Sequence, residues 1–158
     1  MDNVRFLEQK FLGEIVDHLK KASCDIPSLF FDVKESTKKE DTELSFDLVF
    51  NLNFTVSVRI RKACYIKFND LTIRSRTKAG GNTEIHKIME GKAQIYFYAY
   101  MNKAEDKLIK IRVVDVKAIR VLKEKGMYEI KKNADGTEFN TFRFKDIADH
   151  KGGIYKYN

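Results

Sequence analysis

The sequence contains few of the residues that cross-link or interrupt a chain. It has two cysteines, Cys24 and Cys64, which lie far apart and form no CxxC pair. This argues against a disulfide framework and against a zinc knuckle, so we expect both thiols to be reduced and to pack in the interior. The single proline, Pro27, follows a helical pattern and should end it.

Long hydrophobic runs are also absent. No segment approaches the roughly 20 apolar residues that a membrane-spanning helix needs. The opening MDNVRFLEQK lacks the apolar stretch of a secretion signal. We therefore expect a soluble, cytoplasmic protein that has no membrane partner.

Several catalytic signatures are missing as well. No Walker loop and no Rossmann glycine fingerprint occurs, so nucleotide-dependent chemistry has no support. The histidines His18, His86 and His150 have no partner at metal-ligand or catalytic-triad spacing. A histidine-based hydrolase is therefore unsupported.

The chain does contain enough apolar sequence for one folded domain. Of its 158 residues, 43% are hydrophobic and 12% are aromatic, which allows a substantial core and disfavours disorder.

Positive charge is concentrated in residues 59–78. This window carries +6 of the chain's net charge of +7, and Asp70 is its one acidic residue. Such a local basic surface is the electrostatic footprint of a phosphate-rich partner. We therefore predict nucleic-acid binding by the cations of the window, which are Arg59, Arg61, Lys62, Lys67, Arg74, Arg76 and Lys78.

The first half of the chain predicts one helix followed by strands. Apolar residues recur at helical spacing over residues 4–22, with charges on the opposite side. Residues 44–50, 54–61 and 70–76 each alternate apolar and polar side chains, which is typical of strands with one buried face. We expect the first two of these strands to pair as an antiparallel hairpin.

This hairpin would place Asp47 on the face that holds Arg59 and Arg61. Arg74 and Arg76 alternate in the same way on the third strand, so we expect four arginines to point outward from two neighbouring strands. That spacing suits phosphate contacts that do not read bases. The alternative is a solvated face whose charge is balanced by nearby acids, including Asp47.

The second half of the chain predicts a crossover and a hairpin. Gly80 and Gly81 can form a turn before a short helix that ends at Gly91. The run QIYFYAYM, residues 94–101, is apolar on both sides, as in a buried central strand. The third strand, the helix and this strand should form a parallel crossover. Further predicted elements are a strand at 108–116, a helical turn at 117–123, and a hairpin of residues 127–131 and 139–144.

The predicted order of elements resembles the core of the PD-(D/E)XK, or restriction-endonuclease-like, nuclease superfamily. This order is a helix, a hairpin whose first strand carries Asp47, a third strand, a crossover helix and a central aromatic strand. The segment DLTIRSRTKAGGNTEIHKIMEGKAQIYFYAYM, followed by IRVVDVKAIR, is similar to nuclease-like proteins of phages and mobile elements. The resemblance covers roughly residues 44–120, and DGTEF and FRFKDI fit it less specifically.

The resemblance implies a single α+β or α/β domain in which helices flank a central mixed sheet. Residues 4–22 would form its N-terminal helix, residues 44–120 its core, and residues 124–158 a C-terminal extension of strands and a hairpin.

The superfamily motif requires an Asp on one strand and an acid, a spacer and a lysine on the next, because two acids hold Mg²⁺ while the lysine positions water. Asp47 matches the first acid. The second element is absent: Ser57-Val58-Arg59 or Arg59-Ile60-Arg61 stands in its place. Arginine is neither a metal ligand nor a base at ordinary pH, which weakens the case for cleavage.

A displaced carboxylate could restore the metal site. The resemblance allows Glu84 for this role, with Glu90, Glu8 and Glu14 as alternatives, so that Asp47 and Glu84 would bind Mg²⁺. Each residue also has a simpler interpretation. Asp47 could pair with an arginine, and an acid in the first turn of a helix, such as Glu84, is favoured by the helix dipole alone.

Two other patterns have alternatives. Gly80 to Thr83 could present backbone amides to an anion, although a simple turn is the simpler interpretation. The tyrosines and phenylalanine of residues 96–100 could stack on bases, but we expect them to pack in the core because both faces of the strand are apolar.

The sequence thus favours a nucleic-acid-binding protein with a nuclease-like fold, encoded by a phage or mobile element, that has weak or no catalysis. One alternative is a Mg²⁺-dependent nuclease in which Asp47 and Glu84 hold the metal while Arg59 and Arg61 grip the scissile phosphate. Another is an anti-defence protein whose basic face inhibits a nucleic-acid-processing host enzyme.

Overall fold

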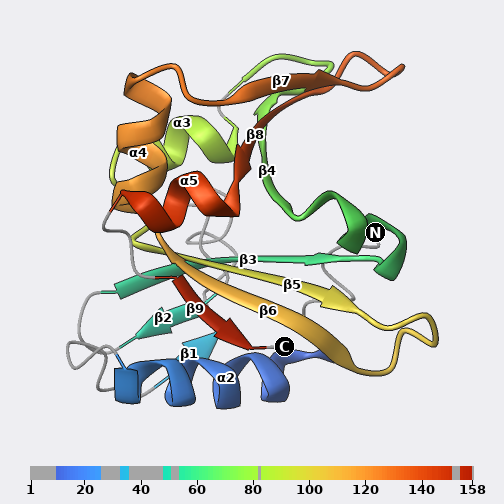
Figure 1. Cartoon of the computed structure of the whole chain (residues 1–158), viewed down its shortest axis with the longest axis vertical. Helices are drawn as coiled ribbons and strands as arrows, with labels where there is room; N and C mark the ends of the chain where they lie inside the picture. The colour runs from blue at the N-terminus through green and yellow to red at the C-terminus, as the bar shows by residue number, and fades with distance from the viewer. Residues whose placement is uncertain are drawn as a thin grey trace.

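Strand β5 (Ile95–Met101) is buried along its whole length and forms the centre of the fold. The computed structural model describes residues 10–25, 33–35, 48–50, 54–81, 83–150 and 154–157 of the chain (Figure 1). The odd-numbered side chains of β5 pack in one hydrophobic core, and its tyrosines pack in a second core on the opposite face. The prediction of a central strand covered on both sides is therefore confirmed.

Strand β5 belongs to a six-stranded mixed sheet, which we call sheet A. Its order is β1 (Val33–Glu35), β2 (Leu48–Phe50), β3 (Phe54–Arg61), β5, β6 (Leu108–Asp115) and β9 (Ile154–Tyr157). Neighbouring strands run antiparallel except β3 and β5, which are parallel. The predicted hairpin is confirmed where it is described, because β2 pairs with β3 with Leu48 opposite Val56.

The predicted parallel crossover from the strand at 70–76 is wrong, because this strand belongs to a second sheet, which we call sheet B. It is antiparallel and has the order β4 (Asp70–Arg76), β8 (Glu138–Arg143), β7 (Glu129–Lys132). The strand at 70–76 was expected to run parallel to β5, but the parallel partner of β5 is β3. Strand β4 pairs instead with β8, which comes much later in the chain, and local alternation carries no information about so distant a partner.

Helices cover both faces of sheet A. Helix α2 (Leu12–Asp25) packs Ile15, Leu19 and Ala22 on one face. Helices α3 (Glu84–Met89), α4 (Val116–Glu124) and α5 (Phe144–Asp149) lie on the other side together with sheet B. Figure 1 shows this layering, with sheet B standing away from sheet A. The predicted helix at 4–22 is confirmed from Leu12 and extends to Asp25, while residues 4–9 lie outside the described part.

The predicted elements of the C-terminal half are confirmed, and two were missed. The helical turn at 117–123 is helix α4, whose N-terminus is capped by the Asp115 carboxylate, which accepts a 2.8 Å hydrogen bond from the backbone N–H of Lys117. Strands β7 and β8 form the predicted hairpin. Helix α5 and strand β9 were not predicted.

One prediction about the cysteines is wrong. Cys64 is a free, exposed thiol on the short 3₁₀ helix η2 (Ala63–Phe68), which follows β3, so it does not pack in the interior. The side chain of Cys24 is not described. In the described part of the chain, no helix is both long and apolar enough to cross a membrane.

Two isoleucines of strand β6 test how the core against sheet A is packed. Ile111 is fully buried, whereas Ile109 lies at a register shift of β6 and is exposed. Ile111→Ala should lower the free energy of unfolding by about 2–5 kcal/mol, because it leaves a cavity between β6 and α2. Ile109→Ala should cost less than about 1 kcal/mol. Urea denaturation measures both, and equal losses would contradict this packing.

A second prediction concerns acid stability. His18 on α2 is buried, and this burial, together with the charge of Lys21, lowers its pKa below the ordinary value of 6.5. The unfolded chain therefore takes up a proton more readily as the pH falls below 6.5. We predict that the free energy of unfolding decreases on acidification through this range, and that His18→Gln reduces the decrease. His150→Gln serves as the control, and an unchanged slope in His18→Gln would contradict the prediction.

Candidate functional site

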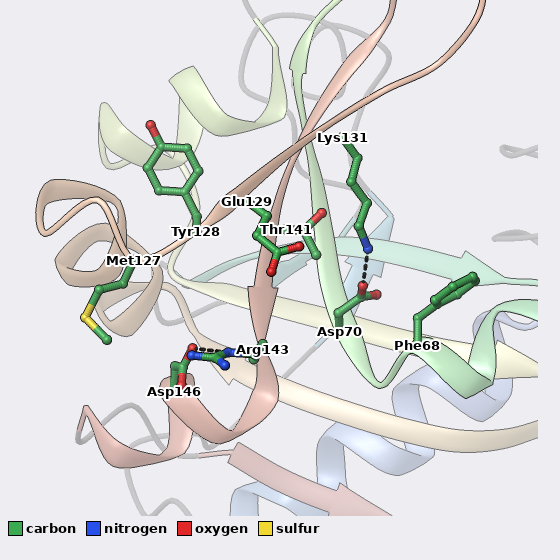
Figure 2. Close-up of a pocket in the computed structure, with 9 residues that line it drawn as sticks. All are labelled: Phe68, Asp70, Met127, Tyr128, Glu129, Lys131, Thr141, Arg143 and Asp146. Atoms are coloured by element: carbon green, nitrogen blue, oxygen red, sulfur yellow. Dashed lines mark hydrogen bonds and ion pairs between the residues drawn. The ribbon is translucent and has the colours of Figure 1, made fainter.

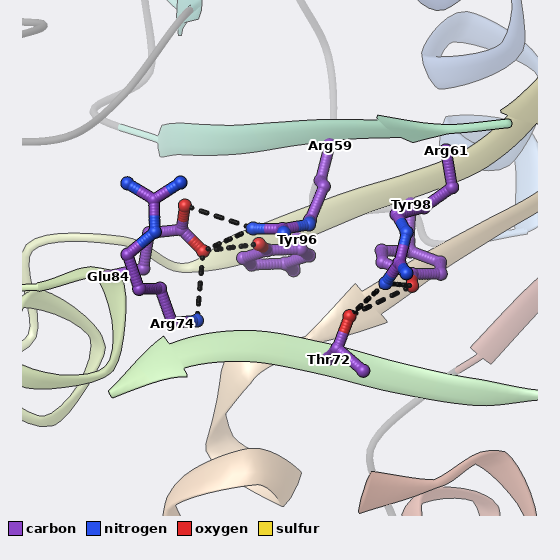
Figure 3. Close-up of polar contacts among 7 residues, drawn as sticks. All are labelled: Arg59, Arg61, Thr72, Arg74, Glu84, Tyr96 and Tyr98. Carbon is purple, nitrogen blue, oxygen red and sulfur yellow. Dashed lines mark hydrogen bonds and ion pairs between the residues drawn. The ribbon is translucent and has the colours of Figure 1, made fainter. Parts of the chain in front are cut away.

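Glu84, the first residue of α3, lies at the junction of the two sheets (Figure 3). Its carboxylate accepts hydrogen bonds from the Arg59 guanidinium at 3.1 and 3.2 Å and from the Tyr96 hydroxyl at 3.1 Å. It also accepts the backbone N–H of Arg74 at 3.3 Å. Thr83 fixes the start of the helix through a reciprocal capping box with His86. One carboxylate thus joins α3 to β3 and β5 of sheet A and to β4 of sheet B.

Arg59 is held in this junction and is not a surface cation. Its side chain is only 16% exposed, and its guanidinium also lies 5.4 Å from the centre of the Phe139 ring. Burial opposes its charge, but the Glu84 carboxylate together with Tyr96 and Tyr98 outweighs burial and raises the pKa of Arg59 above its already high ordinary value. Arg59 therefore stays protonated, and its charge is neutralised by Glu84.

Arg61 makes a second link between the sheets. Its guanidinium donates to the hydroxyls of Thr72 on β4 and of Tyr98 on β5, the latter at 3.1 Å. The Thr72 and Tyr98 hydroxyls are themselves 3.3 Å apart. The guanidinium also lies 4.2 Å from the centre of the exposed Tyr65 ring, so Arg61 reaches from the junction to the surface.

The tyrosines of β5 complete the junction. Tyr96 bonds to Glu84, Tyr98 lies against Thr72, and the Tyr100 hydroxyl donates to the backbone carbonyl of Asp70 at 3.3 Å. Burial raises the pKa of both Tyr96 and Tyr100, so these phenols remain neutral donors. Core packing of the aromatic run is therefore confirmed, and its hydroxyls serve to join the sheets.

These contacts correct the predicted basic face. The four arginines were expected to point outward from two neighbouring strands, but β3 and β4 belong to different sheets. Sheet B covers the polar face of β3 and turns Arg59 and Arg61 into cross-links between the sheets. Arg74 is half-buried beside Glu84, and of these four arginines Arg76 alone is exposed, at the end of β4.

The remaining predicted cations lie on the surface. Lys62, Lys67 and Lys78 are exposed, as is Arg76. Lys62 pairs with Glu105 at 3.0 Å and Arg76 with Glu138 at 3.7 Å. Exposed ion pairs of this kind are weak and exchange easily with solvent ions, so these cations can still contact a phosphate.

Sequence reasoning missed two exposed aromatic side chains between these cations. Tyr65 and Phe68 on η2 are 41% and 53% exposed, and their ring centres are 6.4 Å apart. The Lys67 ammonium lies 5.2 Å and the Lys131 ammonium 5.3 Å from the centre of the Phe68 ring. We call Tyr65, Phe68, Arg61, Lys67 and Lys131 the η2 platform. The signal in the sequence was the run RKACYIKFN, in which aromatic and basic residues alternate.

The predicted metal ligands are only partly described. Asp47 and Glu8 lie outside the described residues. Glu84 already faces the Arg59 guanidinium, and Glu90 pairs with Lys92 at 2.7 Å. Glu14 accepts the backbone N–H of Leu108 at 3.2 Å. Among the described residues no group of three His, Cys, Asp or Glu side chains could hold a metal ion. The described members of this donor set do not form a Mg²⁺ site by themselves, because the carboxylate of Glu84 is bonded to the Arg59 guanidinium.

Comparison of the chain with protein-family models, with curated proteins and with solved structures gave no match. The interpretation of the site therefore depends on its own geometry.

We predict that replacing Glu84 lowers the stability of the fold strongly, because its carboxylate joins the two sheets. Glu84→Ala leaves the Arg59 guanidinium without a counter-charge, and it should lower the free energy of unfolding by about 3 kcal/mol. The double variant Arg59→Met with Glu84→Ala should be more stable than Glu84→Ala alone, because no uncompensated charge remains.

Urea denaturation of the wild type, both single variants and the double variant gives the coupling energy. If Glu84 were instead held ready for a metal, its removal would cost little stability and the two substitutions would be additive.

Proposed function

We propose that this protein binds nucleic acid through the η2 platform and the adjoining exposed cations, and that it does not cleave its ligand. The observation that supports binding is the exposure of Tyr65 and Phe68 beside Arg61, Lys67 and Lys131. Single-stranded nucleic acids bind to such surfaces, because bases stack on aromatic rings while cations follow the phosphates.

The charge distribution supports the same function. Residues 59–78 carry most of the net charge of the chain, and the described cations Lys62, Lys67, Arg76 and Lys78 are exposed. Neutralisation of Arg59 by Glu84 removes one cation from this surface and Asp70 matches Lys131, but Arg61 and Lys67 leave the platform basic. Binding should therefore depend strongly on salt.

The proposal that catalysis is absent has separate support. The acid, spacer and lysine of the nuclease motif are replaced by serine, arginine and apolar residues on β3. Glu84, the carboxylate that the resemblance allows as the second metal ligand, is bonded to a guanidinium.

A restriction-endonuclease-like fold remains part of the proposal. Helix α2, the hairpin of β2 and β3, a crossover that contains α3, and the central parallel strand β5 follow one another in the order that the resemblance implies, whereas its third strand, β4, lies in sheet B. Origin in a phage or mobile element rests on the sequence resemblance alone.

We predict that the protein binds single-stranded DNA or RNA more tightly than a duplex, because only unstacked bases can reach the platform. Fluorescence anisotropy with labelled 20-nucleotide probes at increasing salt measures this. Phe68→Ala should weaken binding about tenfold or more, as expected for loss of one stacking contact. Lys67→Ala should reduce the salt slope by about one, whereas Lys117→Ala on α4 should not. A salt-independent affinity would exclude nucleic acid as the ligand.

Cleavage is tested with the same probes in the presence of Mg²⁺ or Mn²⁺. We expect intact probes. Cleavage that disappears in both Asp47→Ala and Glu84→Ala, with Lys117→Ala unaffected, would overturn the non-catalytic proposal and favour the metal-dependent nuclease.

A further inference from the structure

A pocket of about 450 Å³ opens beside the η2 platform, between η2, the hairpin of sheet B and α5. Figure 2 shows its lining, with Phe68 at one end and Met127 and Tyr128 at the other. Phe68 belongs to both the platform and the pocket, so a strand that stacks on the platform has the pocket within reach of its next base. The size is within the range of small-ligand pockets, which is roughly 300–1,000 Å³.

The ends of the pocket are apolar and aromatic. Phe68 is largely exposed, and Tyr128 is held in place by packing of its ring against Phe142 at 5.9 Å between ring centres. Met127 adds a flexible apolar surface. A flat aromatic ligand suits such walls better than a compact ion does.

The charges of the lining exclude a simple phosphate site. Lys131 donates to the Asp70 carboxylate at 2.7 Å, and Arg143 donates to the Asp146 carboxylate at 2.8 Å. Each of the two cations in the pocket is thus paired with an acid, and Glu129 contributes a further, exposed carboxylate to the lining. The lining is therefore rich in hydrogen-bond acceptors, which favours a ligand that presents N–H donors.

One buried polar group in the lining lacks a partner. Thr141 on β8 is 5% exposed, and its hydroxyl makes no hydrogen bond in the structure. Thr141 lies directly opposite Glu129 in the pairing of β8 with β7, and both line the pocket. A buried hydroxyl without a partner is costly, and because its oxygen is covered in this conformation, a ligand accepts its hydrogen bond only after the Thr141 side chain rotates.

We propose that this pocket binds one unstacked guanine base. The Watson–Crick edge of guanine presents an acceptor, O6, followed by two adjacent donors, N1–H and the N2 amino group. The Glu129 carboxylate can accept from both donors, and the Thr141 hydroxyl donates to O6 once its side chain rotates toward the pocket. Adenine, cytosine and thymine each lack two adjacent donors on this edge. The inference rests on the proposed function, and it adds a base preference to it.

The test uses the full-length protein and 12-nucleotide oligo-dT probes that carry a single central G, A, C or T. The G probe should bind about tenfold more tightly than the others, as expected for one bidentate base contact. Glu129→Gln should abolish this preference while the affinity for oligo-dT stays within about twofold, because the platform is unchanged. Thr141→Val, which has nearly the same shape, should reduce the preference in part.

A titration with free GMP tests the guanine pocket independently of strand binding by the platform. It also shows whether the pocket takes a free nucleotide or only a base within a strand. Protein-detected NMR titration with GMP, with AMP as the control, should shift the amide signals of the pocket for GMP alone. Equal affinity for all four probes, with no response to GMP, would overturn the guanine pocket but leave nucleic-acid binding in place. Failure of every probe to bind, together with a GMP response lost in Glu129→Gln, would overturn the platform and support the pocket.

Discussion

The carboxylate of Glu84 is the interaction on which the junction of the two sheets depends. It sits at the N-terminus of α3, where the helix dipole favours a negative charge, and it collects donors from β3, β4 and β5. The guanidinium of Arg59 can be buried only because this carboxylate compensates it. The hydroxyls of the β5 tyrosines then continue the same connection along the strand, so that sheet B stands at a fixed place above sheet A.

The pairing of charges inside the junction also determines which charged side chains remain on the surface. Arg59 and Glu84 neutralise one another in the junction, so their charges serve to hold the two sheets together. The exposed positive charge lies further out: Lys67 and Lys131 lie beside Phe68, and Arg76 stands at the far end of β4. The turn from β3 into β4 thus places aromatic and basic side chains beside the pocket of sheet B.

The elements could be predicted from the sequence far better than their arrangement. The alternation of β3 and the two-sided apolar character of β5 were correctly interpreted, because each depends on neighbouring residues only. The polar face of β3 was interpreted as solvent-facing, since alternation shows that one face is apolar and cannot show that a distant sheet covers the other. For the same reason Arg59 was assigned to the surface. Glu84 was singled out as a metal ligand, whereas in the structure its carboxylate pairs with the Arg59 guanidinium. Phe68 was missed because an exposed aromatic residue in a connection follows no periodic pattern.

The account is tested most directly by mapping the binding surface of the assigned protein with amide NMR spectra during titration with a 12-nucleotide single-stranded DNA. We predict chemical-shift changes at residues 61–70 and 127–131, and unchanged signals along α2 on the opposite side of sheet A. Two results would contradict the proposal that η2 binds the nucleic acid. One is a set of chemical-shift changes confined to α2, and the other is the absence of any shift at low salt even with a large excess of DNA.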